Sequence, residues 1–269
     1  MHETTPRLRR VLPILSVLVA ATLGLTQQAS AAPAAGERFV ALGDSYSSGV
    51  GAGSYLSDSG SCQRSSKAYP YLWAAANAPA SFSFTACSGA TTGTVKSSQL
   101  APLNSATTLV SVTAGGNDVG FANVMQTCVL QSEATCVSAV NNAIAQINNT
   151  LPGSLSSLYG AIRSKAPQAH VVVLGYPRFY QLNGNCVAGL SETERAAINR
   201  GSDALNGMLA KQAANAGFSY SSVVDEFTGH EICSGSAWLH SVSVPVSNSY
   251  HPTAAGHSGG YLPAFRSAV

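Results

Sequence analysis

The chain has 269 residues and a formal net charge of +2, with 14 lysines and arginines against 12 aspartates and glutamates. This near balance excludes the strongly basic surface with which proteins bind nucleic acid, so we expect no nucleic-acid partner. Charged residues make up only 10% of the sequence, which suits an extracellular protein with a polar but mostly uncharged surface. The length is sufficient for one domain with a sizeable core.

Residues 1–34 have the pattern of a secretory signal peptide. Arginines near the start precede the apolar run VLPILSVLVAATLGL, which is too short to span a bilayer comfortably. Small residues follow at once and allow cleavage after Ala31 or after Ala34, while an uncleaved anchor is the less favoured alternative. We therefore expect a secreted, extracellular protein with a single domain at 35–269 and no transmembrane segment in it.

Apolar runs alternate with helical patterns along the rest of the chain. In chain order we predict a strand at 39–42, a helix at 66–78, strands at 81–87 and 108–116, a helical region at 138–165, a strand at 169–177, a helix at 190–217, a strand at 218–225 and a short C-terminal helix after Pro252. The run AHVVVLGYP at 169–177 is continuous and rich in valine, as expected of a buried parallel strand.

Local signals mark the helix ends. A helix should follow the third strand, with Asn117 or Asp118 near its cap. The Pro-Gly pair at 152–153 should break the helical region in which it stands. The S-x-x-E pattern at 191–194 fits a capping box, and Gly217 should end that helix.

Strands that alternate with helices predict an α/β fold. Its three layers, α/β/α, should have a mostly parallel sheet at the centre. Loops that begin at Ser45, Gly89 and Asn117 each follow a strand and contain polar residues or glycine. Ligands bind at the carboxyl ends of the strands in such sheets. We therefore expect these three residues to lie close together at one edge of the sheet.

Six cysteines, an even number behind a signal peptide, predict disulfide bonds rather than a metal site. Spacing alone cannot select the pairing. We favour bonds between successive cysteines, because each bond would close a loop between neighbouring elements. The expected pairs are Cys62 with Cys87, Cys128 with Cys136, and Cys186 with Cys233.

Ser45 is the candidate nucleophile, since a serine hydroxyl can attack a carbonyl once a base accepts its proton. The tetrahedral oxyanion that forms needs N–H donors. The backbone N–H groups of Ser45 and Gly89 and the side-chain amide of Asn117 could supply them. A turn serine, a turn glycine and a helix-capping asparagine are the structural alternatives.

The motifs GDSYS at 43–47, GGND at 115–118 and HPT at 251–253, with Gly89 between the first two, resemble the SGNH or GDSL family of serine hydrolases. The match looks closest to the secreted lipases, esterases and phospholipases A1 of streptomycetes. This resemblance implies the flavodoxin-like SGNH hydrolase fold. It also implies Ser45 as nucleophile, His251 as general base and then acid, and an oxyanion hole formed by Ser45, Gly89 and Asn117.

His251 is the preferred base because it alone is followed by proline and a small polar residue, unlike His170, His230, His240 and His257. The family commonly has an aspartate three residues before this histidine, where the present chain has Asn248. The resemblance extends to secreted members in which a backbone carbonyl takes that role. We therefore predict a Ser–His dyad in which the carbonyl of Ser249 accepts the Nδ1 proton, with Asp225 and Glu231 as the alternatives.

Two expectations follow from a dyad without a carboxylate. His251 should keep a pKa near its ordinary value of about 6.5, and activity should rise through that pH. Asp44 adjoins Ser45, but neighbouring side chains on an extended segment diverge. Its carboxylate should therefore hydrogen-bond the loop.

The resemblance implies acyl esters of lipids as substrates, met at lipid interfaces, including triacylglycerols and the sn-1 ester of phospholipids. The aromatic residues of GYPRFY, Tyr176, Phe179 and Tyr180, either line an acyl groove or pack on the core. A carbohydrate acetylesterase of the same fold and a non-catalytic secreted binding module are the alternative functions. We expect a monomer with no cofactor and no metal, because the sequence contains neither a calcium loop nor a zinc cluster.

Overall fold

A parallel sheet lies at the centre of the computed structural model, which describes residues 1–3 and 36–269. Its strands are β1 (Arg38–Gly43), β2 (Ser81–Phe84), β3 (Leu109–Thr113), β4 (His170–Leu174) and β5 (Ser219–Ser221). They lie in the order β2-β1-β3-β4-β5, and each neighbouring pair is parallel. The predicted α/β fold with a parallel sheet is confirmed. The apolar run of the predicted signal peptide and both cleavage points lie outside the described residues.

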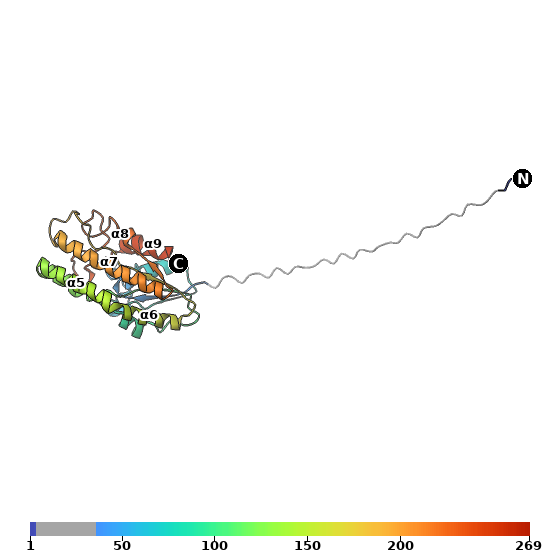
Figure 1. Cartoon of the computed structure of the whole chain (residues 1–269), viewed down its shortest axis with the longest axis horizontal. Helices are drawn as coiled ribbons and strands as arrows, with labels where there is room; N and C mark the ends of the chain where they lie inside the picture. The colour runs from blue at the N-terminus through green and yellow to red at the C-terminus, as the bar shows by residue number, and fades with distance from the viewer. Residues whose placement is uncertain (4–35) are drawn as a thin grey trace. The chain divides into compact units, whose positions relative to one another are not determined.

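Helices cover both faces of the sheet. Helices α2 (Tyr69–Asn77) and α9 (Leu262–Ser267) pack on each other, and α9 also contacts β4 and β5. Helices α5 (Glu133–Asn149), α6 (Leu151–Lys165) and α7 (Glu192–Asn215) form a second group, in which α7 contacts the same two strands. Figure 1 shows α8 (Val224–Phe227) and α9 on one side of the domain and α5 and α6 on the other.

The strands form because their side chains are apolar on both faces. Phe39, Ala41 and Leu42 of β1 have no exposed surface, and neither do Val172 and Val173 of β4. Continuous apolar runs of this kind suit a parallel sheet that is covered on both sides. Residues Ala35–Val269 group into one compact unit around this core.

The remaining helices and helical turns are short. They are α1 (Ser45–Ser48) after β1, α3 (Thr92–Thr94) after β2 and α4 (Phe121–Leu130) after β3, with 3₁₀ turns at Gly60–Cys62 and Val246–Asn248 and π-helical turns at Val95–Gln99 and Gly256–Tyr261. Each of α1, α3 and α4 follows the carboxyl end of a strand, so the loops of interest from the sequence meet at this edge.

Three local predictions differ from the structure. The helical region at 138–165 breaks at Thr150, because Pro152 stands in the first turn of α6, where its missing N–H is no loss. Gly120 is the N-cap of α4, and residues 117–118 lie in the preceding turn. The predicted strand at 218–225 is correct only for its first part, since α8 follows β5 almost at once.

The structure contains three disulfide bonds, between Cys62 and Cys87, between Cys128 and Cys136, and between Cys186 and Cys233. These are the pairs that the sequence analysis favours. The first bond joins the 3₁₀ turn at Gly60–Cys62 to the loop after β2, and the second joins α4 to α5. The third joins the loop before α7 to the loop after α8. The capping box of α7 is also present as predicted.

Candidate active site

Ser45 lies where β1 ends, as the first residue of α1. The turn before it is tight, because Gly43 has a φ of 127° and a Cβ there would lie 2.5 Å from the carbonyl oxygen of Thr113. Only glycine fits this position. Asp44 caps α1 by accepting the N–H of Tyr46. The turn therefore fixes Ser45 at the carboxyl edge of the sheet, beside a cavity that it helps to line.

His251 is in hydrogen-bond contact with Ser45, although 206 residues separate them in the chain. Its Nε2 lies 2.7 Å from Oγ of Ser45, and its Nδ1 lies 3.0 Å from the carbonyl oxygen of Ser249. With the proton on Nδ1, the ring donates to the carbonyl and Nε2 can accept the serine proton. Among the described residues no carboxylate hydrogen-bonds to this ring, and neither Asp225 nor Glu231 contacts it in this way.

Two tyrosines next to Ser45 and His251 tie their segments together. Tyr250 precedes His251 and has a φ of 64°, a left-handed conformation that costs a non-glycine residue about 1 kcal/mol. Its carbonyl accepts the hydroxyl of Tyr46 at 2.5 Å, and the ring of Tyr46 lies 5.3 Å from that of His251 between centroids. Sequence analysis missed both tyrosines, and their only signal was that each adjoins a candidate residue.

Burial lowers the pKa of His251 to about 4, because the charged ring loses its hydration. The carbonyl of Ser249 acts in the opposite direction but does not cancel this effect, and the nearby His240 lowers the pKa further. The expected pKa near 6.5 is therefore wrong, since the sequence does not reveal how deeply the ring lies. At neutral pH the imidazole is uncharged and able to accept a proton.

Asp44 has hydrogen-bond partners for both oxygens of its buried carboxyl group. Oδ1 accepts the hydroxyl of Thr113 at 2.6 Å and the N–H of Tyr46 at 3.0 Å, while Oδ2 accepts the hydroxyl of Tyr176 at 2.5 Å. Burial raises its pKa to about 6, although the hydrogen bonds lower it. Asp44 therefore holds together β1, β3 and the loop after β4, in line with the structural role that the sequence suggests.

The three predicted oxyanion donors line one cavity together with His251. Gly89 has a φ of 76°, which suits glycine, and its N–H makes no hydrogen bond to any residue that the structure describes. Asn117 donates one amide hydrogen to a carbonyl of the loop after β2 at 3.0 Å, which leaves the other amide hydrogen for a ligand. The carboxylate of Asp118 binds the same loop. The structure thus brings together the residues at 45, 89, 117 and 251.

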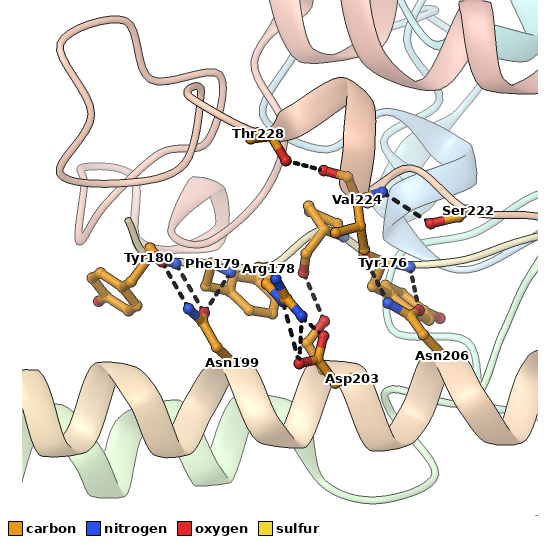
Figure 2. Close-up of polar contacts among 12 residues, drawn as sticks. Tyr176, Arg178, Phe179, Tyr180, Asn199, Asp203, Asn206, Ser222, Val224 and Thr228 are labelled. Carbon is orange, nitrogen blue, oxygen red and sulfur yellow. Dashed lines mark hydrogen bonds and ion pairs between the residues drawn. The ribbon is translucent and has the colours of Figure 1, made fainter. Parts of the chain in front are cut away.

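Polar side chains on α7 hold the loop at 176–180 (Figure 2). Asn206 pairs with both backbone groups of Tyr176, accepting its N–H at 2.8 Å and donating to its carbonyl at 2.7 Å. Asn199 pairs in the same way with Tyr180, one end of the loop. These buried polar residues lie seven positions apart on one face of the helix, and that spacing was the signal that sequence analysis missed.

The aromatic residues of this loop pack on the core, and two of them also line the cavity. Tyr176 and Phe179 line the cavity, and both also belong to the buried core together with Tyr180. The hydroxyl of Tyr176 donates to Asp44, which adjoins Ser45. Contacts from α7 to this loop therefore also connect α7 to the turn that carries Ser45.

The other histidines considered in the sequence analysis have different partners. His240 directs its Nε2 at a backbone carbonyl 2.9 Å away, and His257 is fully buried. His230 stacks on Trp238, and His170 hydrogen-bonds to a carbonyl near the C-terminus. His251 is therefore the histidine that contacts Ser45.

A cavity of about 700 Å³ opens beside Ser45 and His251 and extends between α4, α5 and α7. Its volume is in the range of small-molecule binding sites. The residues of its inner wall share an apolar character and nearly complete burial: Met125, Val140, Ile147, Ile198 and Leu205. The arrangement can thus hold a long apolar group with one end at the serine hydroxyl.

The described part of the chain has neither a membrane-spanning helix nor a cluster of metal-binding side chains. No helix there combines the length and the apolar character needed to cross a membrane. Nor do histidine, cysteine, aspartate and glutamate side chains of residues 1–3 and 36–269 gather in a group of three or more that could hold a metal ion.

Comparison with known proteins gives close relatives along most of the chain. Residues 41–258 match the family model described as the GDSL-like Lipase/Acylhydrolase family. Lipase 1 of Streptomyces coelicolor (strain ATCC BAA-471 / A3(2) / M145) is 59% identical over 265 residues, which cover 97% of this chain and 98% of that protein.

Two solved structures are similar in both sequence and fold. The phospholipase A1 of Streptomyces albidoflavus NA297 is 63% identical, with a TM-score of 0.85. The extracellular lipase of Streptomyces rimosus is 60% identical, also with a TM-score of 0.85. Each match covers 87% of this chain and 100% of the other.

Proposed function

Because the chain belongs to the GDSL-like lipase/acylhydrolase family and is a carboxylic ester hydrolase, we propose that it cleaves acyl esters of lipids through Ser45 and His251. The observation that carries this proposal is the apolar cavity of about 700 Å³ that opens beside the contact between these two side chains. The names of the relatives, lipase and phospholipase A1, agree with a lipid substrate.

The proposed reaction begins when Oγ of Ser45 attacks the ester carbonyl carbon while Nε2 of His251 takes the serine proton. The N–H groups of Ser45 and Gly89 and the amide of Asn117 stabilise the oxyanion of the tetrahedral intermediate. His251 then gives its proton to the departing alcohol, and an acyl-serine remains. Water attacks this ester with the same base and oxyanion donors, which releases the fatty acid and restores the serine.

The carbonyl of Ser249 is proposed to orient the base. It accepts a hydrogen bond from the N–H of Nδ1, which lies 3.0 Å from the carbonyl oxygen. This bond selects the tautomer in which Nε2, the nitrogen that faces Ser45, carries no proton. A neutral carbonyl attracts the imidazolium less strongly than a carboxylate does. We therefore assign the chain a dyad with backbone support, and neither Asp225 nor Glu231 takes part in it.

The cavity between α4, α5 and α7 is proposed to hold the acyl chain. Its buried apolar wall removes methylene groups from water, and each one contributes about 0.8 kcal/mol. An acetyl group would leave most of this wall uncovered. The cavity therefore favours lipid esters over the acetyl esters of carbohydrates, and the contact of a base with a serine hydroxyl favours catalysis over mere binding.

We also infer that the protein is secreted, acts at lipid interfaces as a monomer and needs no metal. The basic and apolar pattern of residues 1–34, the three disulfide bonds and the extracellular lipase among the relatives all support secretion. Activity that survives EDTA would support metal independence.

The test is hydrolysis of p-nitrophenyl esters from acetate to palmitate, with EDTA present, by the wild type and by Ser45→Ala and His251→Ala. Ser57→Ala is the matched control, since Ser57 is exposed and does not line the cavity. We expect the highest turnover at medium or long chains, its loss in both dyad variants and its retention in the control. Turnover of acetate alone would instead indicate an acetylesterase, and no wild-type turnover would indicate a binding module.

A further inference from the structure

The mouth of the cavity is bordered by apolar side chains that are exposed. Val242, Val244 and Val246, on the segment before His251, are 57%, 96% and 75% exposed. At the end of α4, Leu130 is 63% exposed and also lines the cavity. We call these four residues, with the half-exposed Val129, the apolar rim.

The rim is continuous with the cavity beside Ser45. Val129 and Leu130 line the cavity from α4, and Val242 and Val246 line it from the later segment. Val244, between the last two on the same segment, is exposed but does not itself line the cavity. A surface that covered the rim would therefore lie directly over the entrance to the proposed acyl site.

Both segments of the rim lack charged residues. Between Asp118 and Glu133, and again between Glu231 and Arg266, the sequence contains no lysine, arginine, aspartate or glutamate. A protein partner or an anionic membrane would commonly be met by charged groups around such a patch. An exposed apolar patch without charges fits a surface that offers hydrocarbon behind neutral headgroups.

We propose that the apolar rim docks on the surface of aggregated lipid with neutral headgroups, such as phosphatidylcholine, and places the cavity entrance against it. This inference rests on the proposed function, because it takes the cavity as the acyl site. The valines and Leu130 enter the boundary between headgroups and acyl chains, where burial of their side chains holds the protein. An ester can then pass from the lipid surface into the cavity without crossing bulk water.

The binding experiment uses Ser45→Ala protein, which leaves the lipid intact, and sedimentation with phosphatidylcholine vesicles. In this background Val244→Glu should weaken partition about tenfold or more, because a charge would have to enter the lipid surface in place of an apolar side chain. Val244→Trp should strengthen partition. Val187→Glu is the matched control, since Val187 is fully exposed and lies outside the rim. Binding should persist in 1 M NaCl, because no charge pairs contribute to it.

A second measurement separates docking from folding and from catalysis. With Ser45 intact, Val244→Glu should hydrolyse soluble p-nitrophenyl butyrate at the wild-type rate but vesicle phosphatidylcholine at least tenfold more slowly. Equal vesicle binding by Val244→Glu and the wild type would overturn the proposal, as would loss of binding in 1 M NaCl. A wild-type dimer in sedimentation velocity that Val244→Glu dissociates would also overturn it, by assigning the rim to a second copy of the chain.

The two proposals can fail separately. Binding that depends on Val244, without hydrolysis of any lipid ester, would leave the docking surface standing and refute the proposed function. Lipid hydrolysis at the same rate by the wild type and by Val244→Glu would support the proposed function and refute the docking surface.

Discussion

Gly201 is the position at which the length of the cavity can be changed by one substitution. It lies on α7 and lines the cavity opposite Val140 of α5, and a Cβ built at Gly201 would lie 3.4 Å from Cγ1 of Val140. A leucine there adds four carbons, which must occupy part of the space between the two helices. If they displace about three methylene groups of a bound acyl chain, at about 0.8 kcal/mol each, the loss is about 2.4 kcal/mol. We therefore expect kcat/KM for long acyl esters to fall about 60-fold.

The assay is the p-nitrophenyl ester series with Gly201→Leu, and Gly207→Leu serves as control. Gly207 lies on the same helix with nothing within 4 Å of a built Cβ and does not line the cavity, so both variants gain the same helix propensity. Butyrate should be hydrolysed by Gly201→Leu at nearly the wild-type rate, while the preferred chain becomes shorter. An unchanged chain-length profile in a variant that folds would refute our placement of the acyl chain between α5 and α7.

Further predictions concern pH and stability. Because the pKa of His251 is about 4 and only the neutral ring accepts a proton, kcat/KM should rise as pH increases through about 4 and be level by pH 6; a midpoint near 6.5 in the pH profile would contradict the effect of burial. Asn206→Leu should lower stability by about 2–4 kcal/mol, measured by urea unfolding, because it leaves both backbone groups of Tyr176 unpaired; a loss below 0.5 kcal/mol would show that water replaces the amide. Removing the Cys186–Cys233 bond, which spans 47 residues, should lower the free energy of unfolding by about 4 kcal/mol. Removing the Cys128–Cys136 bond, which spans 8, should lower it by only about 2.6 kcal/mol. The opposite order in the same assay would contradict the chain-entropy account.

The strands could be predicted from the sequence because a parallel strand that is buried on both faces leaves a continuous apolar run. The runs that end at Leu42 and Leu174 are of this kind. The weakest strand was misjudged at its end, since the apolar pair Val223-Val224 suits a buried strand as well as the start of α8, and only packing decides between them. Pro152 was misread because the same residue breaks a helix in its interior and starts one at its N-terminus.

The candidate site could be predicted only as far as local motifs extend. Ser45 and His251 each stand in a short pattern, and in the structure Oγ of the serine lies 2.7 Å from Nε2 of the histidine. The parts that hold them were beyond reach, because they depend on contacts between distant segments. The bond from Tyr46 to the backbone at Tyr250 spans 204 residues. The lowered pKa of His251 is likewise a property of the surrounding fold, which no local pattern records.

Because Ser45 and His251 are far apart in the sequence, the two residues of the proposed dyad are synthesised at different times. Ser45 enters a growing polypeptide early, whereas His251 follows only 206 residues later. Every intermediate that ends before residue 251 lacks the proposed base, and a cut between the two positions places Ser45 and His251 on different segments. A nascent chain that has not reached residue 251 therefore cannot carry out the proposed ester cleavage.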